Sequence, residues 1–292
     1  MRRLSRILFL LCLWSCAAPL MAIAGEQEPP LVLGVHPYLS PGELVARFTP
    51  LARYLAHATG RQVEVRVGRS YAEHINALGT GLIDLAYMGP ASYVTMTRQF
   101  GPRPLLVRQV INHDPLLKGE IVVRQNSPIR TLGDFQGKCF YFGDANSTMS
   151  HILPELTLAR AGVPLSRLGS YHTLDGHNNI ALGILSGDCD GGAVKSEVYE
   201  AFKLRGLRAV ADLPEVADHV LVASNHLPPE LVQKLRQALL KLNQDPDGPR
   251  IMTAIHPHMT ALVPARDSDY DSLRHLMESA AHMNPAKVPI SP

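Results

Sequence analysis

The sequence has few of the features that mark several large classes of protein. Its 292 residues include one Trp and four Cys, and 18% are charged whereas 46% are hydrophobic. This balance excludes a disordered chain and a multi-span membrane protein. The 22 Gly and 23 Pro are scattered, without the period of a collagen-like repeat. A formal net charge of +2 argues against a dedicated nucleic-acid binder. The length is ample for one large or two medium lobes.

The first 24 residues have the pattern of a secretory signal peptide. A basic start with three arginines precedes an apolar stretch, and Ala22-Ile23-Ala24 is a small-x-small cleavage site. We therefore expect residues 1–24 to be removed and the mature protein to be exported to the periplasm. Two alternatives stay open. The segment could be retained as a membrane anchor, or it could be processed as a lipoprotein at Cys16, where the bulky Trp14 is unfavourable.

Removal of the signal leaves Cys139 and Cys189 in a chain with 25 basic and 26 acidic residues. An even pair of cysteines in an oxidising compartment predicts one disulfide, with two separate buried thiols as the alternative. Asp188 and Asp190 flank Cys189 and could suggest a metal site, but we favour the disulfide as the role of Cys189. We predict neither a metal nor another cofactor.

Apolar runs and helical patterns alternate along the chain, which is typical of an α/β fold. The apolar run Leu31–Val35 predicts a strand, and apolar side chains at helical spacing within residues 44–55 predict a helix that ends at Gly60. The same criteria predict further strands at Val63–Val67, Ile83–Met88, Ile121–Val123, Lys138–Phe142, Asp190–Val194, Leu207–Val210 and Val220–Ala223, and further helices at Tyr71–Leu78, Ala91–Phe100, Ser150–Ala161, Asn178–Leu185, 231–242 and 270–281.

Three polar loops follow predicted strands, at His36–Pro41, Gly89–Tyr93 and Asp144–Ser150. In open α/β sheets, ligands bind outside the carboxyl ends of the strands. The third loop has the most donors, because Ser147 and Thr148 precede a helix whose first backbone N–H groups favour an anion. A simple helix cap by either hydroxyl is the alternative for this segment taken alone.

From about Leu31 to Leu276 the sequence resembles the periplasmic solute-binding proteins of phosphonate, phosphite and phosphate ABC importers. Each matching segment is short, and the order and spacing of the segments together carry the resemblance. The segments are Gly34-Val35-His36-Pro37-Tyr38, Pro50–Leu55, the most specific stretch Asp84–Tyr93, Ser147-Thr148 with Pro154, Gly176-His177 and Gly187–Ala193.

The resemblance implies a two-lobed α/β fold, the type II periplasmic-binding fold, with two hinge crossovers. We place lobe one at residues 31–117 plus 216–292, and lobe two at residues 118–215. It also implies a monomeric, non-enzymatic protein that captures a small oxyanion in an interlobe cleft and serves an ABC permease. A ligand would close the lobes by a hinge motion. A ligand-binding component that feeds a membrane sensor kinase is the alternative, since both partners need the same closing cleft.

The family's oxyanion site can be transferred residue by residue. Hydroxyl groups would donate to the oxyanion, and a histidine would donate as a neutral imidazole or pair as a cation. A carboxylate in the site would accept a hydrogen bond, and so would favour a ligand oxygen that keeps its proton. The positions are Ser147, Thr148, His177 and Asp190, with contacts from Tyr38 and Tyr93.

The loop departs from the family's usual Ser-Thr-Ser-Gly pattern, because Met149 and Ser150 occupy the last two positions. Met149 removes one hydroxyl donor and adds a polarizable thioether, while Ser150 supplies a donor from the next position. We therefore expect Ser150 to join the ligand-binding residues. The departure leaves the ligand open between phosphonate, another oxyanion and a neutral arsenite-like solute.

Several other residues have alternative interpretations. Ser147, His177 and Asp190 have the residue types of a catalytic triad, but no G-x-S-x-G elbow accompanies them, and we predict a protein that is not an enzyme. His256-Pro257-His258 lacks a third nearby metal ligand and predicts a surface loop. Tyr87 lies in a predicted buried strand and is expected in the core.

Overall fold

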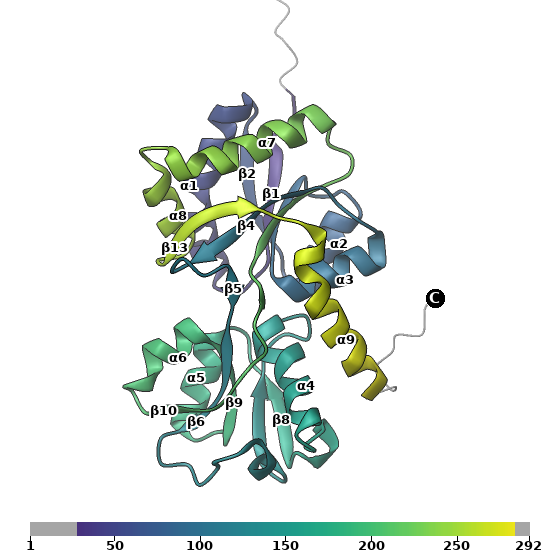
Figure 1. Cartoon of the computed structure of the whole chain (residues 1–292). Coiled ribbons are helices and arrows are strands. Elements are labelled where there is room, and N and C mark those ends of the chain that lie inside the picture. The colour runs from purple at the N-terminus through teal and green to yellow at the C-terminus, as the bar shows by residue number, and fades with distance from the viewer. Residues whose placement is uncertain (1–27, 284–292) are drawn as a thin grey trace, which may run out of the picture.

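The computed structural model describes residues 28–283, which form two α/β lobes joined by two chain crossings (Figure 1). One lobe is built on a six-stranded sheet and the other on a five-stranded sheet. Between the sheets, β5 (Leu116–Leu117) pairs antiparallel with β11 (Val216–Ala217). The two-lobed fold predicted from the sequence is confirmed. The predicted signal peptide lies outside the described residues.

The six-stranded sheet has the order β13-β4-β12-β3-β1-β2 and mixes parallel with antiparallel pairs. Strand β1 runs parallel to β2 and β3, whereas β4 is antiparallel to β12 and β13. The strands are β1 (Leu31–Val35), β2 (Val63–Val67), β3 (Leu85–Met88), β4 (Leu105–Ile111), β12 (Val220–Ala223) and β13 (Met259–Pro264). The helices of this lobe are α1 (Pro41–Thr59), α2 (Tyr71–Gly79), α3 (Pro90–Phe100), α7 (Pro229–Lys241) and α8 (Gly248–Ile255).

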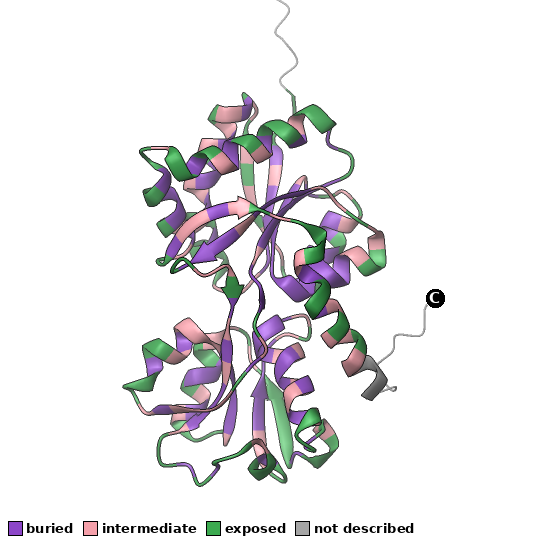
Figure 2. Cartoon of the chain, in the orientation of Figure 1, coloured by how far each residue is buried: buried purple, intermediate pink, exposed green. Residues whose placement is uncertain are grey.

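The five-stranded sheet has the order β10-β6-β9-β7-β8, with its central strands buried and its edge strand β8 exposed (Figure 2). Its strands are β6 (Gly119–Arg124), β7 (Cys139–Phe142), β8 (Ser170–Thr173), β9 (Gly191–Lys195) and β10 (Leu207–Asp212). The helices of this lobe are α4 (Leu153–Arg160), α5 (His177–Ser186) and α6 (Ser196–Lys203). The last helix, α9 (Asp271–Met283), packs against α3 in one lobe and α4 in the other (Figure 1).

Helix α1 shows how local sequence determines an element. Pro41 occupies the first helical position, where its missing N–H costs nothing, and Gly60 ends the helix with a left-handed φ of 78°. Leu44, Phe48 and Leu51 follow helical spacing and are buried against the six-stranded sheet. The predicted helix and its predicted end are therefore confirmed.

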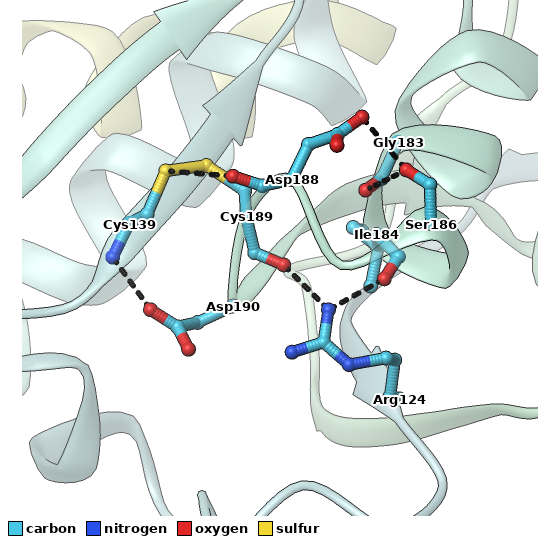
Figure 3. Close-up of a disulfide and its surroundings, with 8 residues drawn as sticks. All are labelled: Arg124, Cys139, Gly183, Ile184, Ser186, Asp188, Cys189 and Asp190. Atoms are coloured by element: carbon cyan, nitrogen blue, oxygen red, sulfur yellow. Dashed lines mark hydrogen bonds between the residues drawn. A yellow bond between two sulfur atoms is a disulfide. The ribbon is translucent and has the colours of Figure 1, made fainter.

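The predicted disulfide between Cys139 and Cys189 is present (Figure 3). Cys139 begins β7 and Cys189 precedes the neighbouring strand β9, which brings the two Cα atoms to 4.9 Å. Arg124 supports the bridge, because its Nη1 donates to the carbonyl oxygens of Cys189 and Ile184 at 2.8 and 2.7 Å. The alternative of two separate thiols is thus wrong in this structure. Within residues 28–283, no helix has both the length and the apolar character needed to cross a membrane.

Candidate functional site

A small cavity lies between the lobes, where the loops that follow β1, β3 and β7 meet the N-terminus of α5. Its volume is about 40 Å³, which is room for about three water molecules. The first lobe contributes His36 and Tyr87, and the second contributes Ser147 and His177. His219, which follows the crossing strand β11, also lines the cavity. The space fits a compact guest held by polar side chains from both lobes.

The structure brings some of the residues predicted from the sequence to this cavity and places others elsewhere. Those that line the cavity are Tyr38, Ser147, Thr148 and His177, and those that do not are Ser150, Asp190 and Tyr93. Met149, the departure from the family loop, also borders the cavity and packs into the buried core.

Ser147 and Ser150 act as a pair. The Ser150 hydroxyl donates to Ser147 Oγ at 2.7 Å, and the Ser150 backbone N–H is directed to the same oxygen at 3.4 Å. Ser147 therefore caps the turn, and its hydroxyl lies in the cavity wall next to the Tyr71 hydroxyl, with which it interacts. The chain makes a π-helical turn over Thr148–Ile152 before α4, a distortion that is frequent at functional sites. Ser150 lines a wider groove beside the cavity, and its hydrogen bond orients Ser147.

Thr148 connects the two lobes. Its Oγ1 accepts the backbone N–H of Ala91 at 3.0 Å, in the first turn of α3. A side chain of the second lobe thus caps a helix of the first lobe. Because Oγ1 accepts this bond, the Thr148 hydroxyl proton is free to donate toward the cavity.

His177 stands at the N-terminus of α5 and presents a donor. Its Nδ1 accepts the backbone N–H of Lys195 at 3.2 Å, so in the neutral ring the proton is on Nε2. Burial, together with the positive charge of Lys195, lowers the pKa of His177 to about 3. A catalytic-triad histidine would donate from Nδ1 to a carboxylate, and His177 does not.

Asp190 and Tyr93 have structural partners instead of a place in the cavity. Asp190 Oδ2 accepts the backbone N–H of Cys139 at 2.9 Å, beside the disulfide (Figure 3). The Tyr93 ring packs against Tyr270 with centroids 4.8 Å apart, and its hydroxyl donates to Asp267. The acceptor expected from Asp190 is therefore not located in this cavity.

The sequence prediction missed a chain of hydrogen bonds that ends at His219. The Tyr87 hydroxyl donates to Gln109 Oε1 at 2.6 Å, which orients the amide so that Gln109 Nε2 donates to Asp218 Oδ1 at 2.9 Å. Asp218 is 1% exposed, and the same Oδ1 accepts His219 Nδ1–H at 2.8 Å. The buried carboxylate orients the ring and leaves Nε2 for a guest. Tyr87 is buried, as predicted, but it also lines the cavity and begins this chain.

His36 adds the acceptor that Asp190 does not supply. Its Nδ1 and His74 Nε2 both lie 3.1 Å from the Tyr87 carbonyl oxygen, which can only accept, so both nitrogens carry protons. Burial, reinforced by repulsion from His219 and His74, holds the pKa of His36 well below its ordinary value. The neutral ring therefore has a lone pair on Nε2, for which the described residues offer no partner.

The buried histidines make the fold sensitive to acid. Burial lowers the pKa of His74 to about 4 against an ordinary value of 6.5, so the folded state binds fewer protons than the unfolded chain as the pH falls. We expect His74 to contribute a loss of about 2–3 kcal/mol in the free energy of unfolding between about pH 7.5 and pH 4.5. Urea unfolding of wild type and His74→Gln at both pH values measures this change in the free energy of unfolding. The matched control is His57→Gln at an exposed histidine. An equally steep pH dependence in His74→Gln and wild type would contradict this expectation.

The outer wall of the cavity contains Lys195, Glu197 and His256. His258 is exposed, as predicted for a surface loop, but His256 is half-buried, and its Nε2 lies 2.8 Å from Glu197 Oε2. Among residues 28–283, no three His, Cys, Asp or Glu side chains are grouped so that they could hold a metal ion.

Comparison with known proteins places this geometry in a family. Residues 33–270 match the family model described as ABC transporter, phosphonate, periplasmic substrate-binding protein. The phosphate-import protein PhnD of Mycolicibacterium smegmatis is 28% identical over 276 residues, covering 85% of each chain. A probable ABC transporter phosphite binding protein, PhnD1 of Prochlorococcus marinus, is 25% identical over 211 residues, covering 68% of this chain and 70% of that protein.

Solved structures show the same fold. A binding protein component of an ABC phosphonate transporter from Pseudomonas aeruginosa superposes with a TM-score of 0.78 at 19% identity, covering 90% of each chain. PhnD1 of Prochlorococcus marinus in complex with methylphosphonate superposes with a TM-score of 0.77 at 21% identity, covering 85% of this chain and 97% of that chain. The family model spans most of the chain, and the protein therefore belongs to the periplasmic substrate-binding proteins of phosphonate ABC transporters.

Proposed function

We propose that this protein, as the extracytoplasmic binding component of an ABC importer, captures a small phosphorus oxyanion that keeps one proton. The observation that carries the proposal is the mixed polarity of the cavity. Ser147 and His177 face it as donors, whereas His36 presents an unprotonated ring nitrogen. A phosphite, phosphate or phosphonate monoanion has oxygens that accept and one hydroxyl that donates, so it satisfies both kinds of group.

The same polarity disfavours sulfate. Sulfate has no proton near neutral pH, so one of its oxygens would face the lone pair of His36 without a hydrogen between them. An acceptor placed among the donors of this cavity is therefore a selective feature. His219, which the buried Asp218 orients through Nδ1, adds a second imidazole to the cavity wall.

The proposed lobe boundaries are residues 31–117 plus 216–292 for the first lobe and 118–215 for the second. The short paired strands β5 and β11 support these limits, because they connect one sheet to the other. A guest bound between the lobes would stabilise the closed arrangement, which a membrane permease can recognise. In this proposal the protein acts as an exported monomer and leaves its guest chemically unchanged.

Calorimetric titration with phosphite, methylphosphonate, phosphate and sulfate tests the proposal. We expect at least one phosphorus oxyanion to bind and sulfate to bind far more weakly. Ser147→Ala and His177→Ala should each weaken binding by about 1–3 kcal/mol, because each removes a buried donor from the guest. Asp190→Asn is the matched control, since Asp190 lies at the disulfide, and its affinity should equal that of wild type. Unchanged affinity in both site variants, or sulfate binding as tight as phosphite, would overturn the proposal.

A further inference from the structure

One ion cluster, built from both lobes, separates the cavity from a wider groove outside it. Lys195 ends β9 and Glu197 lies in α6 of the second lobe, whereas His256 follows α8 in the first lobe. Glu197 Oε2 lies 2.6 Å from Lys195 Nζ and 2.8 Å from His256 Nε2. These three side chains border both the cavity of about 40 Å³ and the outer groove of about 830 Å³.

The bond between His256 and Glu197 is held in place from both ends. His256 Nδ1 accepts the backbone N–H of His258 at 3.2 Å, so Nε2 carries the proton that is donated to Glu197, even when the ring is neutral. Arg47 Nη1 donates to the Ile255 carbonyl at 3.2 Å and fixes the end of α8. The side chains of His256 and Glu197 are only 12% and 25% exposed, so the bond is largely shielded from water.

Lys195 adds a second contact across the lobes. Its Nζ lies 5.9 Å from the ring centroid of Tyr38, which belongs to the first lobe. Burial alone would raise the pKa of Glu197, but the hydrogen bonds and charges of His256 and Lys195 hold that pKa well below its ordinary value. The carboxylate is thus charged, its Oε2 is bonded by groups from both lobes, and the cluster lies where the cavity meets the outer groove.

We propose that Lys195, Glu197 and His256 form an interlobe gate that restricts guests to oxyanions without a bulky substituent. This inference rests on the proposed function. A hydrogen, hydroxyl or methyl group on phosphorus can remain in the small inner cavity. A larger substituent that extends toward the outer groove meets this cluster, and making room for it breaks the hydrogen bond between Glu197 and His256 and holds the lobes apart.

The test compares methylphosphonate with phenylphosphonate by calorimetry. We expect wild type to prefer methylphosphonate by about tenfold or more, and His256→Ala to reduce that preference to about threefold or less, mainly by binding phenylphosphonate more tightly. The His256 side chain bonds Glu197 and not the Lys195 backbone N–H that supports His177, so this variant leaves the donor set intact. His258→Ala, the same substitution at an exposed neighbour, is the matched control and should keep the wild-type preference.

A second variant and a second measurement keep the test decisive. Glu197→Gln retains the shape of the side chain but loses the ion pair, and it should give an intermediate preference. Small-angle scattering of the ligand-free proteins should show a larger radius of gyration for His256→Ala than for wild type and His258→Ala. Unchanged preference and unchanged dimensions in a folded His256→Ala that still binds methylphosphonate would overturn the gate alone. If wild type binds no phosphorus oxyanion, the proposed function is wrong. The gate is then tested by scattering alone, and an unchanged radius of gyration in His256→Ala would contradict it.

Discussion

Replacing both Cys139 and Cys189 with alanine is expected to lower the free energy of unfolding by about 4 kcal/mol. The two cysteines are 50 residues apart in the sequence, so the bridge removes much of the freedom of the unfolded chain. Urea unfolding of the oxidised wild type and the double variant measures the difference. Wild type treated with dithiothreitol is the control for the loss of the two cysteine side chains, of which Cys189 is buried. A loss below about 1 kcal/mol would show that the bridge adds little constraint.

The effect should be confined to stability. The bridge joins the beginnings of β7 and β9, and the loop with Ser147 lies at the opposite end of β7. Arg124 still bonds the carbonyl of residue 189 in the variant, and Asp190 still accepts the N–H of residue 139. The remaining folded protein should therefore bind its guest with wild-type affinity at temperatures well below its melting point.

Asp218→Ala is expected to weaken binding of the preferred oxyanion by about 100-fold and to destabilise the fold by about 3 kcal/mol. Oδ1 of Asp218 accepts three N–H groups, from Gln109 Nε2, His219 Nδ1 and the His219 backbone. Alanine leaves all three without an acceptor in a buried place, and His219 loses the group that orients it. Calorimetry and urea unfolding measure the two effects.

Asp218→Asn separates the charge of this carboxylate from its geometry. The amide retains an oxygen for the N–H donors but accepts weaker hydrogen bonds than a carboxylate, so it holds His219 less firmly, and we expect about a tenfold loss of affinity. The exposed Asp212→Asn is the control for removal of one negative charge. If Asp218→Asn binds as tightly as wild type, the carboxylate acts by orientation alone.

Elements with a regular apolar pattern could be predicted from the sequence, and elements without one were missed. Strand β8 is exposed along its whole length, so it has no alternation to detect. Helix α8 is short and begins with Gly248 and Pro249, which are typical of a loop. In β4, Arg108 and Gln109 interrupt the apolar run. Gln109 is buried because it bonds Tyr87 and Asp218, which no local pattern indicates. The remaining helices and strands without a prediction are α6, β13 and the two-residue strands β5 and β11.

The site divides in the same way. Ser147 and His177 are in short segments that the family resemblance identifies, whereas Gln109 and Asp218 meet across 109 residues of sequence. His219 could have been found from the sequence, because Asp218 and His219 form a polar pair between the apolar runs Val216–Ala217 and Val220–Ala223. Asp190 was placed by the resemblance, but its carboxylate bonds the N–H of Cys139, because β7 and β9 are neighbours in the sheet.

The hydrogen bond between Thr148 and Ala91 has a consequence for the empty protein. Capping a helix contributes about 1 kcal/mol, and this cap exists only while the two lobes touch. Separation of the lobes exposes the first turn of α3 to solvent. The hydrogen bond between Thr148 and Ala91 therefore stabilises the closed form even when no ligand is bound. Closure therefore does not by itself require a ligand, and a ligand shifts the balance between the open and closed forms only by the contacts that it adds to this cap.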